Sequence, residues 1–357
     1  MNQYMTEILG QFELASEPVS CERYGCGHIN ETYLVVTGNG ARYILQKINH
    51  QIFQDVPGLM GNIAGVTGHL TRQSSDPRRV LTLVQTKSGQ TYYHAPDGSY
   101  WRIYVFVEGS VCLQQPETPA DFYESAVAFG EFQQMLKDFP AHTLHETIPN
   151  FHHTPDRYRI FREVLEKDPM GRAGEVKAEI EFVLAREEEA GTLIRLLAEG
   201  KLPLRVTHND TKLNNVMLDS QTRKALCVID LDTVMPGLSL YDFGDSIRFG
   251  AASAAEDEQN LSKVEMKLDL FEIYTKGFLQ ACPDLTRMER AMLPMGAKLM
   301  TLECGVRFLT DYLDGDHYFA THRPGQNLDR ARTQFKLVSD MEGKWEQMHA
   351  IVKNIVG

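Results

Sequence analysis

The chain has 357 residues, more than the roughly 100–200 of a typical domain, so we expect it to fold into two lobes. It has 48 acidic and 36 basic residues, and the net charge of −12 disfavours nucleic acid and anionic membranes as partners. No stretch approaches the roughly 18 uninterrupted apolar residues that a membrane-spanning helix requires. The chain starts without the segments of an export signal and its cysteines form no C-x-x-C pair, so we expect a cytoplasmic protein with reduced thiols.

The first hundred or so residues predict a β-rich region, because β-branched and aromatic residues are concentrated in short segments. Gly38–Gly40 predicts a hairpin between Thr32–Thr37 and Arg42–Ile48. A second hairpin is expected between Leu81–Thr86 and Thr91–His94. The predicted strands are Thr32–Thr37, Arg42–Ile48, Leu81–Thr86, Thr91–His94 and Trp101–Val107.

After about residue 112 the pattern becomes helical. One stripe at spacings of three and four is apolar apart from a single glutamine, and consists of Phe122, Ala126, Phe129, Gln133 and Leu136. Further helices are expected near residues 175–199, 264–280, 286–313 and 329–354. The sequence therefore predicts an α+β fold, with a small β-rich lobe over residues 1–107, a larger helical lobe over residues 108–357, and a hinge near Phe106–Cys112.

The clearest chemical signal is a loop that follows a predicted short strand, Leu204–Thr207. His208, Asn209 and Asp210 come next, and Asn215 lies five residues after Asp210, which matches the spacing of an H-R-D-x-x-x-x-N catalytic loop. A tight hairpin is then predicted between Val216–Leu218 and Ala225–Ile229, and its end leads into Asp230.

These side chains suit phosphoryl transfer. The reaction needs a carboxylate that deprotonates the acceptor hydroxyl, and hard oxygen ligands that hold Mg²⁺ on the phosphates of ATP. Asp210 supplies the first group, and Asn215 and Asp230 supply the second. Each of them alone could equally be a turn or capping residue, and it is the combined spacing that favours the chemical interpretation.

A second acidic motif, Asp242-Phe243-Gly244, spells the D-F-G metal-binding triplet of protein kinases. It lies 32 residues after Asp210, whereas Asp230 lies 20 residues after it and directly at a strand end, so we assign the metal to Asp230. Asp242 is expected to buttress the catalytic loop, and Asp245 to cap a helix or to pair with Arg248. Two further interpretations are that Asp232 joins a second metal and that His208 braces the loop.

A glycine-rich segment precedes the first clear strand. Gly25 and Gly27 could bring backbone N–H groups close to phosphate, although turn glycines are common. His28 and Asn30 could reach the acceptor or the phosphate, or could be plain turn residues.

Several longer motifs resemble those of the bacterial N-acetylhexosamine 1-kinases, in the aminoglycoside phosphotransferase-like branch of the protein-kinase-like fold. The motifs are T-H-N-D-T-K-L-N-N, V-I-D-L-D-T, M-P-G, Y-D-F-G-D-S-I-R-F-G and E-C-G-V-R-F-L-T-D-Y-L. The resemblance runs along nearly the whole chain. It implies a bilobal fold in which residues 1–107 bind the nucleotide and residues 108–357 carry the catalytic loop, metal site and sugar pocket.

The activity implied by this resemblance is phosphorylation of the anomeric hydroxyl of N-acetylglucosamine or N-acetylgalactosamine by ATP and Mg²⁺, for amino-sugar salvage. Asp210 would be the base, next to the sugar, with Asn215 and Asp230 on magnesium. The other residues implied in the sugar pocket are His28, Asn30, Arg307 and Tyr318. Arg307 could donate to sugar or phosphate oxygens, or could form an ion pair on a helix surface.

The nucleotide side departs from the general kinase pattern. Gln46 stands where many relatives place a phosphate-pairing lysine, Lys47 should face the opposite side of the sheet, and Leu59–Leu70 contains no glutamate to pair with such a lysine. Either Gln46 or Lys47 could contact phosphate. Adenine is expected to bind the backbone of Phe106, Val107 and Glu108.

Two competing functions stay open at this point. One is a kinase of the same fold that acts on homoserine, choline or an aminoglycoside, although Arg307 in the pocket would repel a cationic acceptor. The other is a non-catalytic nucleotide-binding module, which the missing lysine–glutamate pair favours and the intact set of Asp210, Asn215 and Asp230 disfavours.

Overall fold

The computed structural model describes residues 2–25 and 29–357, which form two compact units. Unit 1 consists of Met1–Val111, Asp138–Pro149 and Met217–Met235, and unit 2 of Cys112–Lys137, Asn150–Val216 and Pro236–Gly357. The sequence placed a boundary at residue 107 and assigned all later residues to one lobe. Unit 1 runs on to Val111 and also contains the two later segments, and the predicted division of roles between the lobes stays a prediction.

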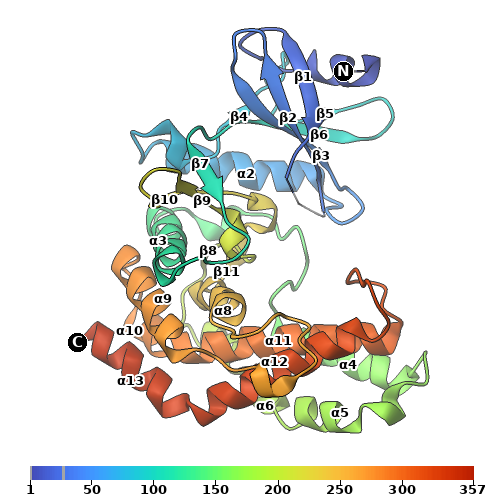
Figure 1. The fold of residues 1–357 in the computed structure, drawn as a ribbon, viewed down its shortest axis with the longest axis vertical. Helices are drawn as coiled ribbons and strands as arrows, with labels where there is room; N and C mark the ends of the chain where they lie inside the picture. Colours follow the sequence, from blue (N-terminus) through green and yellow to red (C-terminus); the bar gives the residue numbers. More distant parts are fainter. Residues whose placement is uncertain (1, 26–28) are drawn as a thin grey trace. The chain divides into compact units, whose positions relative to one another are not determined.

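Unit 1 is built on an antiparallel sheet with the strand order β1-β2-β3-β6-β4, and β5 pairs with β6 as well (Figure 1). The strands are β1 (Pro18–Arg23), β2 (Glu31–Thr37), β3 (Arg42–Ile48), β4 (Leu83–Val84), β5 (Tyr93–His94) and β6 (Tyr100–Val105), and the helices are α1 (Gln3–Leu9) and α2 (Val56–Thr71). The predicted hairpin of β2 and β3 is confirmed. The second predicted hairpin is wrong, because β4 and β5 each pair with β6. The sequence did not predict α1 or β1.

The register of β3 against β6 sorts side chains onto two faces of this sheet. Gln46 lies opposite Arg102, and Lys47 lies opposite Trp101. Because side chains alternate along a strand, Gln46 and Arg102 share one face while Lys47 and Trp101 share the other. The second face is covered by α1, whose apolar side chains pack with Leu45, Trp101 and Ile103 in the core.

A smaller sheet, with the strand order β10-β9-β7, lies mostly in unit 1. Its strands are β7 (Ser110–Cys112), β9 (Val216–Asp219) and β10 (Ala225–Val228). The pairing of β9 with β10 confirms the predicted tight hairpin. The chain that leaves β10 reaches Asp230 at once, as the sequence predicted.

Unit 2 is mainly helical, with a short ladder of strands β8 (Arg205–Thr207) and β11 (Met235–Gly237). Its helices are α3 (Pro119–Met135), α4 (Thr154–Lys167), α5 (Lys177–Leu184), α6 (Glu187–Ala190), α7 (Thr192–Ala198), α8 (Ser239–Gly250), α9 (Leu268–Ala281), α10 (Arg287–Ala291), α11 (Leu293–Asp314), α12 (Gln326–Gly343) and α13 (Trp345–Val356). The stripe predicted on α3 is buried along its whole length. Figure 1 shows α11 and α12 running side by side, and α11 also packs on α8.

Three predicted helical stretches are interrupted in the structure. Residues 175–199 form α5, α6 and α7, residues 286–313 form α10 and α11, and residues 329–354 form α12 and α13. Pro294 lies in the first turn of α11, where its ring is tolerated, and a helix continuing from α10 would have placed it in an interior. Gly343 ends α12 before Trp345 begins α13. Trp345 is half-buried, with the ammonium of Lys298 at 5.3 Å from its ring centroid.

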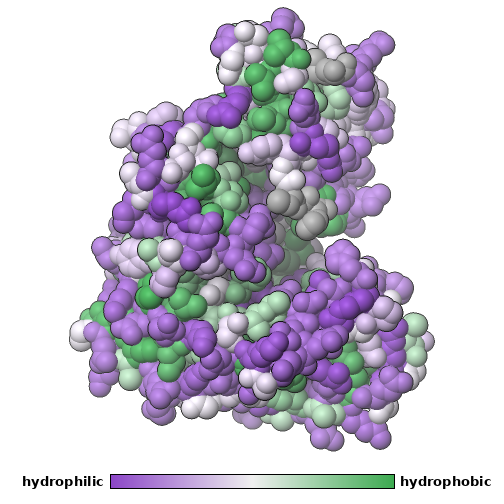
Figure 2. All heavy atoms as spheres, viewed as in Figure 1, coloured by the Kyte–Doolittle hydropathy of each residue, from purple (hydrophilic) through white to green (hydrophobic). Residues whose placement is uncertain are grey.

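The surface carries both hydrophilic and hydrophobic side chains. Figure 2 shows hydrophilic residues over most of the face in view, with hydrophobic residues in smaller groups. Within the described ranges, every helix is too short or too polar to cross a lipid bilayer.

Candidate active site

The loop that carries Asp210 is braced from behind by a buried carboxylate. Asp242, in the first turn of α8, is fully buried and accepts hydrogen bonds from the backbone N–H groups of His208 (3.0 Å) and Asn209 (2.8 Å). It also accepts one from the side chain of Gln133 at 2.7 Å, which explains the polar member of the apolar stripe on α3. The predicted buttressing role of Asp242 is therefore confirmed.

Two buried histidines hold the same loop. The ring of His208 packs edge-on against Phe129 at 5.4 Å, and its Nδ1 accepts from the N–H of Asp210 at 3.3 Å, so its predicted bracing role is confirmed. The ring of His152 lies between two acceptors, with Nδ1 at 2.9 Å from Glu303 Oε1 and Nε2 at 3.1 Å from the carbonyl of Asn209. The backbone on both sides of Asp210 is thus fixed by buried polar contacts.

The carboxylate of Asp210 is partly exposed and has close polar neighbours. Lys212 Nζ lies 2.8 Å from Oδ1, and Asn215 Nδ2 donates to Oδ2 at 3.1 Å and to the Asp210 carbonyl at 2.8 Å. Burial alone would lower the pKa of Lys212, but the charges of Asp210 and Asp245 outweigh it and raise that pKa. In the described part of the chain, Asn215 Oδ1 accepts no hydrogen bond, which leaves a hard oxygen beside Asp210.

Asp245 lies on the other side of the same loop. It accepts from the N–H of Thr211 at 3.1 Å and pairs with Arg248 at 3.0 Å, as predicted. Burial opposes ionisation of this carboxyl, yet Arg248 and Lys212 hold its pKa below the usual range.

Asp230 belongs to unit 1, whereas Asp210 and Asn215 belong to unit 2. It is exposed and has φ 58° and ψ 61°, a left-handed conformation that non-glycine residues adopt at a cost. Leu231–Thr233 then form a 3-10 turn. The carboxylate of Asp242 already serves the catalytic loop, which favours Asp230 as the metal ligand. That assignment stays a prediction.

The glycine-rich segment is described only in part. Gly25 has φ +76°, and none of the described residues beyond its chain neighbours lies within 4 Å of the point where a Cβ would project. Gly27 and His28 lie outside the described residues. Asn30 is buried, donates to Asp232 Oδ2 at 2.6 Å and accepts from the N–H of Asn49 at 3.0 Å. Its predicted contact with the sugar stays a prediction.

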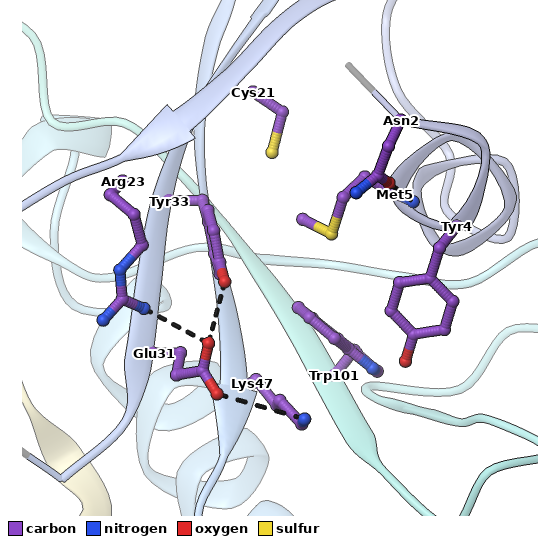
Figure 3. Close-up of a pocket in the computed structure, with 9 residues that line it drawn as sticks. All are labelled: Asn2, Tyr4, Met5, Cys21, Arg23, Glu31, Tyr33, Lys47 and Trp101. Carbon is purple, nitrogen blue, oxygen red and sulfur yellow. Dashed lines mark hydrogen bonds and ion pairs between the residues drawn. The ribbon is translucent and has the colours of Figure 1, made fainter.

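Gln46 and Lys47 have different surroundings. Gln46 Oε1 accepts from Arg102 Nε (3.0 Å) and Nη2 (2.8 Å) on the face of the sheet opposite α1. Lys47 lies on the α1 side, 3.9 Å from Glu31, with its ammonium 5.8 Å from the Trp101 ring centroid (Figure 3). It lines a cavity of about 400 Å³ between α1 and the strands. Of the two candidates for a phosphate contact, this placement favours Gln46.

The predicted adenine segment follows β6. The N–H of Phe106 donates to the Arg42 carbonyl at 3.1 Å, and the carbonyl of Val107 accepts from Ser110 Oγ at 2.7 Å. Glu108 is exposed and forms an ion pair with Arg42, which holds its pKa below the usual range. The segment is therefore anchored to β3, and its contact with adenine stays a prediction.

Arg307 and Tyr318 are brought together in unit 2. Arg307, on α11, lies 5.4 Å from the Phe151 ring and 5.6 Å from the Tyr318 ring, and its Nη2 donates to the Tyr318 hydroxyl at 3.3 Å. Asp311, one turn further along α11, accepts from the backbone N–H groups of His317, Tyr318 and Phe319. The loop with Tyr318 is thus fixed to the helix that carries Arg307.

Sequence reasoning missed two charged residues, Lys212 in unit 2 and Arg102 in unit 1. Lys212 is a basic residue two positions after Asp210, and this spacing was the available signal. Arg102 is the charged residue within the apolar strand Trp101–Val107, and an unpaired charge in a buried strand is costly. A buried partner could therefore have been expected.

Comparisons with known proteins identify the family of this chain. A model of the phosphotransferase enzyme family matches residues 20–271, which is well over half of the chain. The chain belongs to this phosphotransferase family. The predicted aminoglycoside phosphotransferase-like family and the predicted bilobal, protein-kinase-like fold class are thereby confirmed, and the narrower resemblance to the N-acetylhexosamine 1-kinases stays a prediction.

Solved structures resemble this phosphotransferase along nearly its whole length. The microcompartment-associated aminopropanol kinase is 18% identical with a TM-score of 0.60, over 97% of this chain and 98% of that chain. An aminoglycoside phosphotransferase from Alicyclobacillus acidocaldarius is 14% identical with a TM-score of 0.63, over 98% and 96%. The amicoumacin kinase hAmiN, in complex with AMP-PNP, Ca²⁺ and Ami, is 14% identical with a TM-score of 0.60, over 96% and 94%. At these identities the likeness shows the fold alone.

Proposed function

We propose that this phosphotransferase transfers the terminal phosphoryl group of ATP to the anomeric hydroxyl of N-acetylglucosamine or N-acetylgalactosamine. The observation that carries the proposal is the braced loop with a partly exposed Asp210 beside Lys212 and Asn215. The motif resemblance supports the choice of sugar, and the nucleotide in the hAmiN complex supports a nucleoside triphosphate as donor.

Asp210 would accept the proton of the sugar hydroxyl as the hydroxyl oxygen attacks the terminal phosphorus atom of ATP. A rigid loop suits this role, because effective general bases are held within hydrogen-bond reach of the proton they take. The buried contacts of Asp242 and His152 supply that rigidity.

Magnesium would be held by Asn215 and Asp230. Both side chains carry hard oxygen atoms, and Asn215 Oδ1 accepts no bond from the described residues. When bound, Mg²⁺ neutralises charge on the phosphate oxygens during transfer.

Arg307 and Tyr318 would bind the acceptor. A guanidinium held among aromatic rings and a hydroxyl beside it can donate to sugar oxygens. Among the residues that the structure describes, Arg307 forms no ion pair with a carboxylate, so its charge favours a neutral or anionic acceptor over a cationic one.

A kinase for another small alcohol is the second candidate, favoured by the fold it shares with the aminopropanol kinase. An acceptor panel with Mg²⁺ and ATP separates the two. N-acetylglucosamine, N-acetylgalactosamine, their methyl glycosides, aminopropanol, choline, homoserine and an aminoglycoside are compared by ADP release, and the product is examined by ³¹P NMR.

The free N-acetylhexosamines should turn over to a 1-phosphate, and the methyl glycosides should be inert because their anomeric hydroxyl is blocked. Turnover of a methyl glycoside would place the transfer on another hydroxyl. Turnover restricted to an amine acceptor would overturn the sugar assignment, and ATP binding without turnover of any acceptor would favour a non-catalytic module.

A further inference from the structure

A buried arginine lies on the face of the main sheet of unit 1 that is opposite α1. The side chain of Arg102 is only 1% exposed, and burying a charge costs several kcal/mol unless it is paired and hydrogen-bonded. Arg102 forms an ion pair with Asp232 through Nη1, while its Nε and Nη2 both donate to Gln46 Oε1. Burial alone would lower the pKa of Arg102, but the charge of Asp232 outweighs it and raises that pKa.

Asp232 is held from a second side. Its Oδ1 faces Arg102, and its Oδ2 accepts from Asn30 Nδ2 at 2.6 Å. Asn30 is itself fixed by the N–H of Asn49, which donates to its Oδ1 at 3.0 Å. Both oxygens of Asp232 are thus engaged within unit 1, which argues against the alternative that Asp232 joins a second metal.

This network anchors the turn that carries Asp230. Asp232 lies in the middle of the 3-10 turn Leu231–Thr233, and Asp230 immediately precedes that turn in a left-handed conformation. Such a conformation costs about 1–3 kcal/mol in a non-glycine residue and persists where the surroundings hold it. The bonds from Arg102 and Asn30 to Asp232 supply such surroundings, because they engage both oxygens of the residue in the middle of the turn.

The same arginine fixes Gln46, which stands at the strand position where protein kinases carry the lysine that pairs with phosphate. Gln46 Nε2 donates to Thr32 Oγ1 at 3.1 Å, so both ends of its amide are held. One guanidinium therefore connects β3, β6 and the turn after β10.

We propose that Arg102 is a positioning residue for the magnesium–nucleotide site, acting through Gln46 and through the Asp232 anchor of Asp230. The inference rests on the proposed function, since Asp230 has a metal to bind only if the chain uses magnesium and ATP. Arg102 supplies the buried cation that a lysine on β3 would otherwise provide, from the neighbouring strand and paired with Asp232.

The test compares Arg102→Lys and Arg102→Met with the unaltered protein. Lysine keeps a positive charge but lacks the planar fork that reaches Gln46 and Asp232 together. We expect each variant to weaken magnesium activation and to raise the KM for ATP about 10–100-fold, the usual effect of losing a group that orients a metal ligand. The KM for the acceptor should change less than the KM for ATP, because the network reaches the predicted sugar residues only through Asn30, which keeps its bond from the N–H of Asn49.

The matched control is Lys47→Gln, which removes a charge from the next position of β3 but on the opposite face of the sheet. It should leave the magnesium dependence unchanged. A folded Arg102→Lys protein with normal magnesium dependence, or with equal losses for ATP and acceptor, would overturn the inference. An unaltered protein that neither binds nor uses ATP would overturn the proposed function instead.

A measurement on the unaltered protein covers the case in which the variants fail to fold. Amide hydrogen exchange of Val234, whose N–H closes the turn by donating to the Leu231 carbonyl at 3.2 Å, should be slow without nucleotide or metal if the anchor holds the turn in advance. Exchange as fast as in exposed loops would show that Arg102 and Asn30 do not fix it, and the positioning role would be lost.

Discussion

The carboxylate of Asp210 owes its position to bonds made by the backbone around it. Asp242 binds two successive N–H groups of the loop, and His152 contacts the carbonyl between them and Asp210. Burial raises the pKa of Asp242, although the bonds from the N–H groups of His208 and Asn209 act in the opposite direction. The triplet Asp242-Phe243-Gly244 thus serves the loop from within a helix, as the sequence predicted for Asp242.

Replacing Asp210 by asparagine should lower kcat about 10²–10⁴-fold, because the amide cannot accept the proton of the acceptor. Its shape and its contact with Asn215 are largely kept, so the fold should be retained by circular dichroism and the KM for ATP should change little. The exposed Asp284→Asn variant serves as the control and should keep full activity. An Asp210→Asn protein with near-normal kcat would contradict the base assignment.

Two helices of unit 2, α8 and α11, approach each other closely where glycines face each other. A Cβ added to Gly244 of α8 would lie 2.3 Å from the carbonyl oxygen of Gly296 in α11, and one added to Gly296 would lie 2.8 Å from the carbonyl oxygen of Leu240. The two helices therefore touch backbone to backbone directly behind the catalytic loop. No side chain can be admitted there without moving α8.

Gly244→Ala should consequently destabilise the protein by about 1–3 kcal/mol or more, measured as the free energy of unfolding in urea, because the new methyl group meets rigid backbone. Since α8 carries Asp242, kcat should fall as well. Gly61→Ala, in the interior of α2, meets open space and should instead stabilise by up to about 1 kcal/mol. Equal effects of the two substitutions would show that the close approach is unimportant.

Strong local patterns were enough to predict several elements. The hairpin of β2 and β3, the hairpin before Asp230 and the buried stripe of α3 follow from alternation, turn glycines and helical spacing. β4 and β5 were predicted as a hairpin because their pairing with β6 is a tertiary choice that local sequence does not encode. Arg102 escaped notice for the same reason, since its partner Asp232 is 130 residues away.

Across the whole molecule, an acidic chain keeps several carboxylates buried beside cations or donors. The pKa values of Asp245, Glu289 and Glu303 are held below their usual range in spite of burial, by Arg248, by Arg205 and by His152, respectively. A carboxyl with a lowered pKa in the folded state binds fewer protons there than in the unfolded chain. Stability from such groups is complete above their usual pKa and is lost as the pH falls below it. Asp242 has a raised pKa, so its contribution to stability falls as the pH rises.

Glu303→Gln tests how a buried carboxylate with a lowered pKa contributes to stability as the pH changes. Glu303 has an ordinary pKa near 4.5, and its contribution should be present at neutral pH and decline as the pH falls below that value. The variant should be less stable at pH 7 and should lose stability less steeply in acid, by up to about 1.4 kcal/mol per pH unit, the limit for one proton. Urea unfolding from pH 7 to pH 3 measures both. Glu272→Gln, a glutamate paired with Lys276 near the surface of α9, gives the effect of a surface carboxylate, and an equal slope for both variants would refute the argument.

The placement of the indole rings offers a way to watch each unit separately. The sequence contains two tryptophans, of which Trp101 lies in the core of unit 1 and Trp345 lies beneath Lys298 in unit 2. Replacing either one by phenylalanine leaves a protein with a single tryptophan, which can be excited at wavelengths that the tyrosines do not absorb. The emission of Trp101 would report ligand-induced changes in the sheet that carries Arg102, and that of Trp345 would report the helices, without any attached dye.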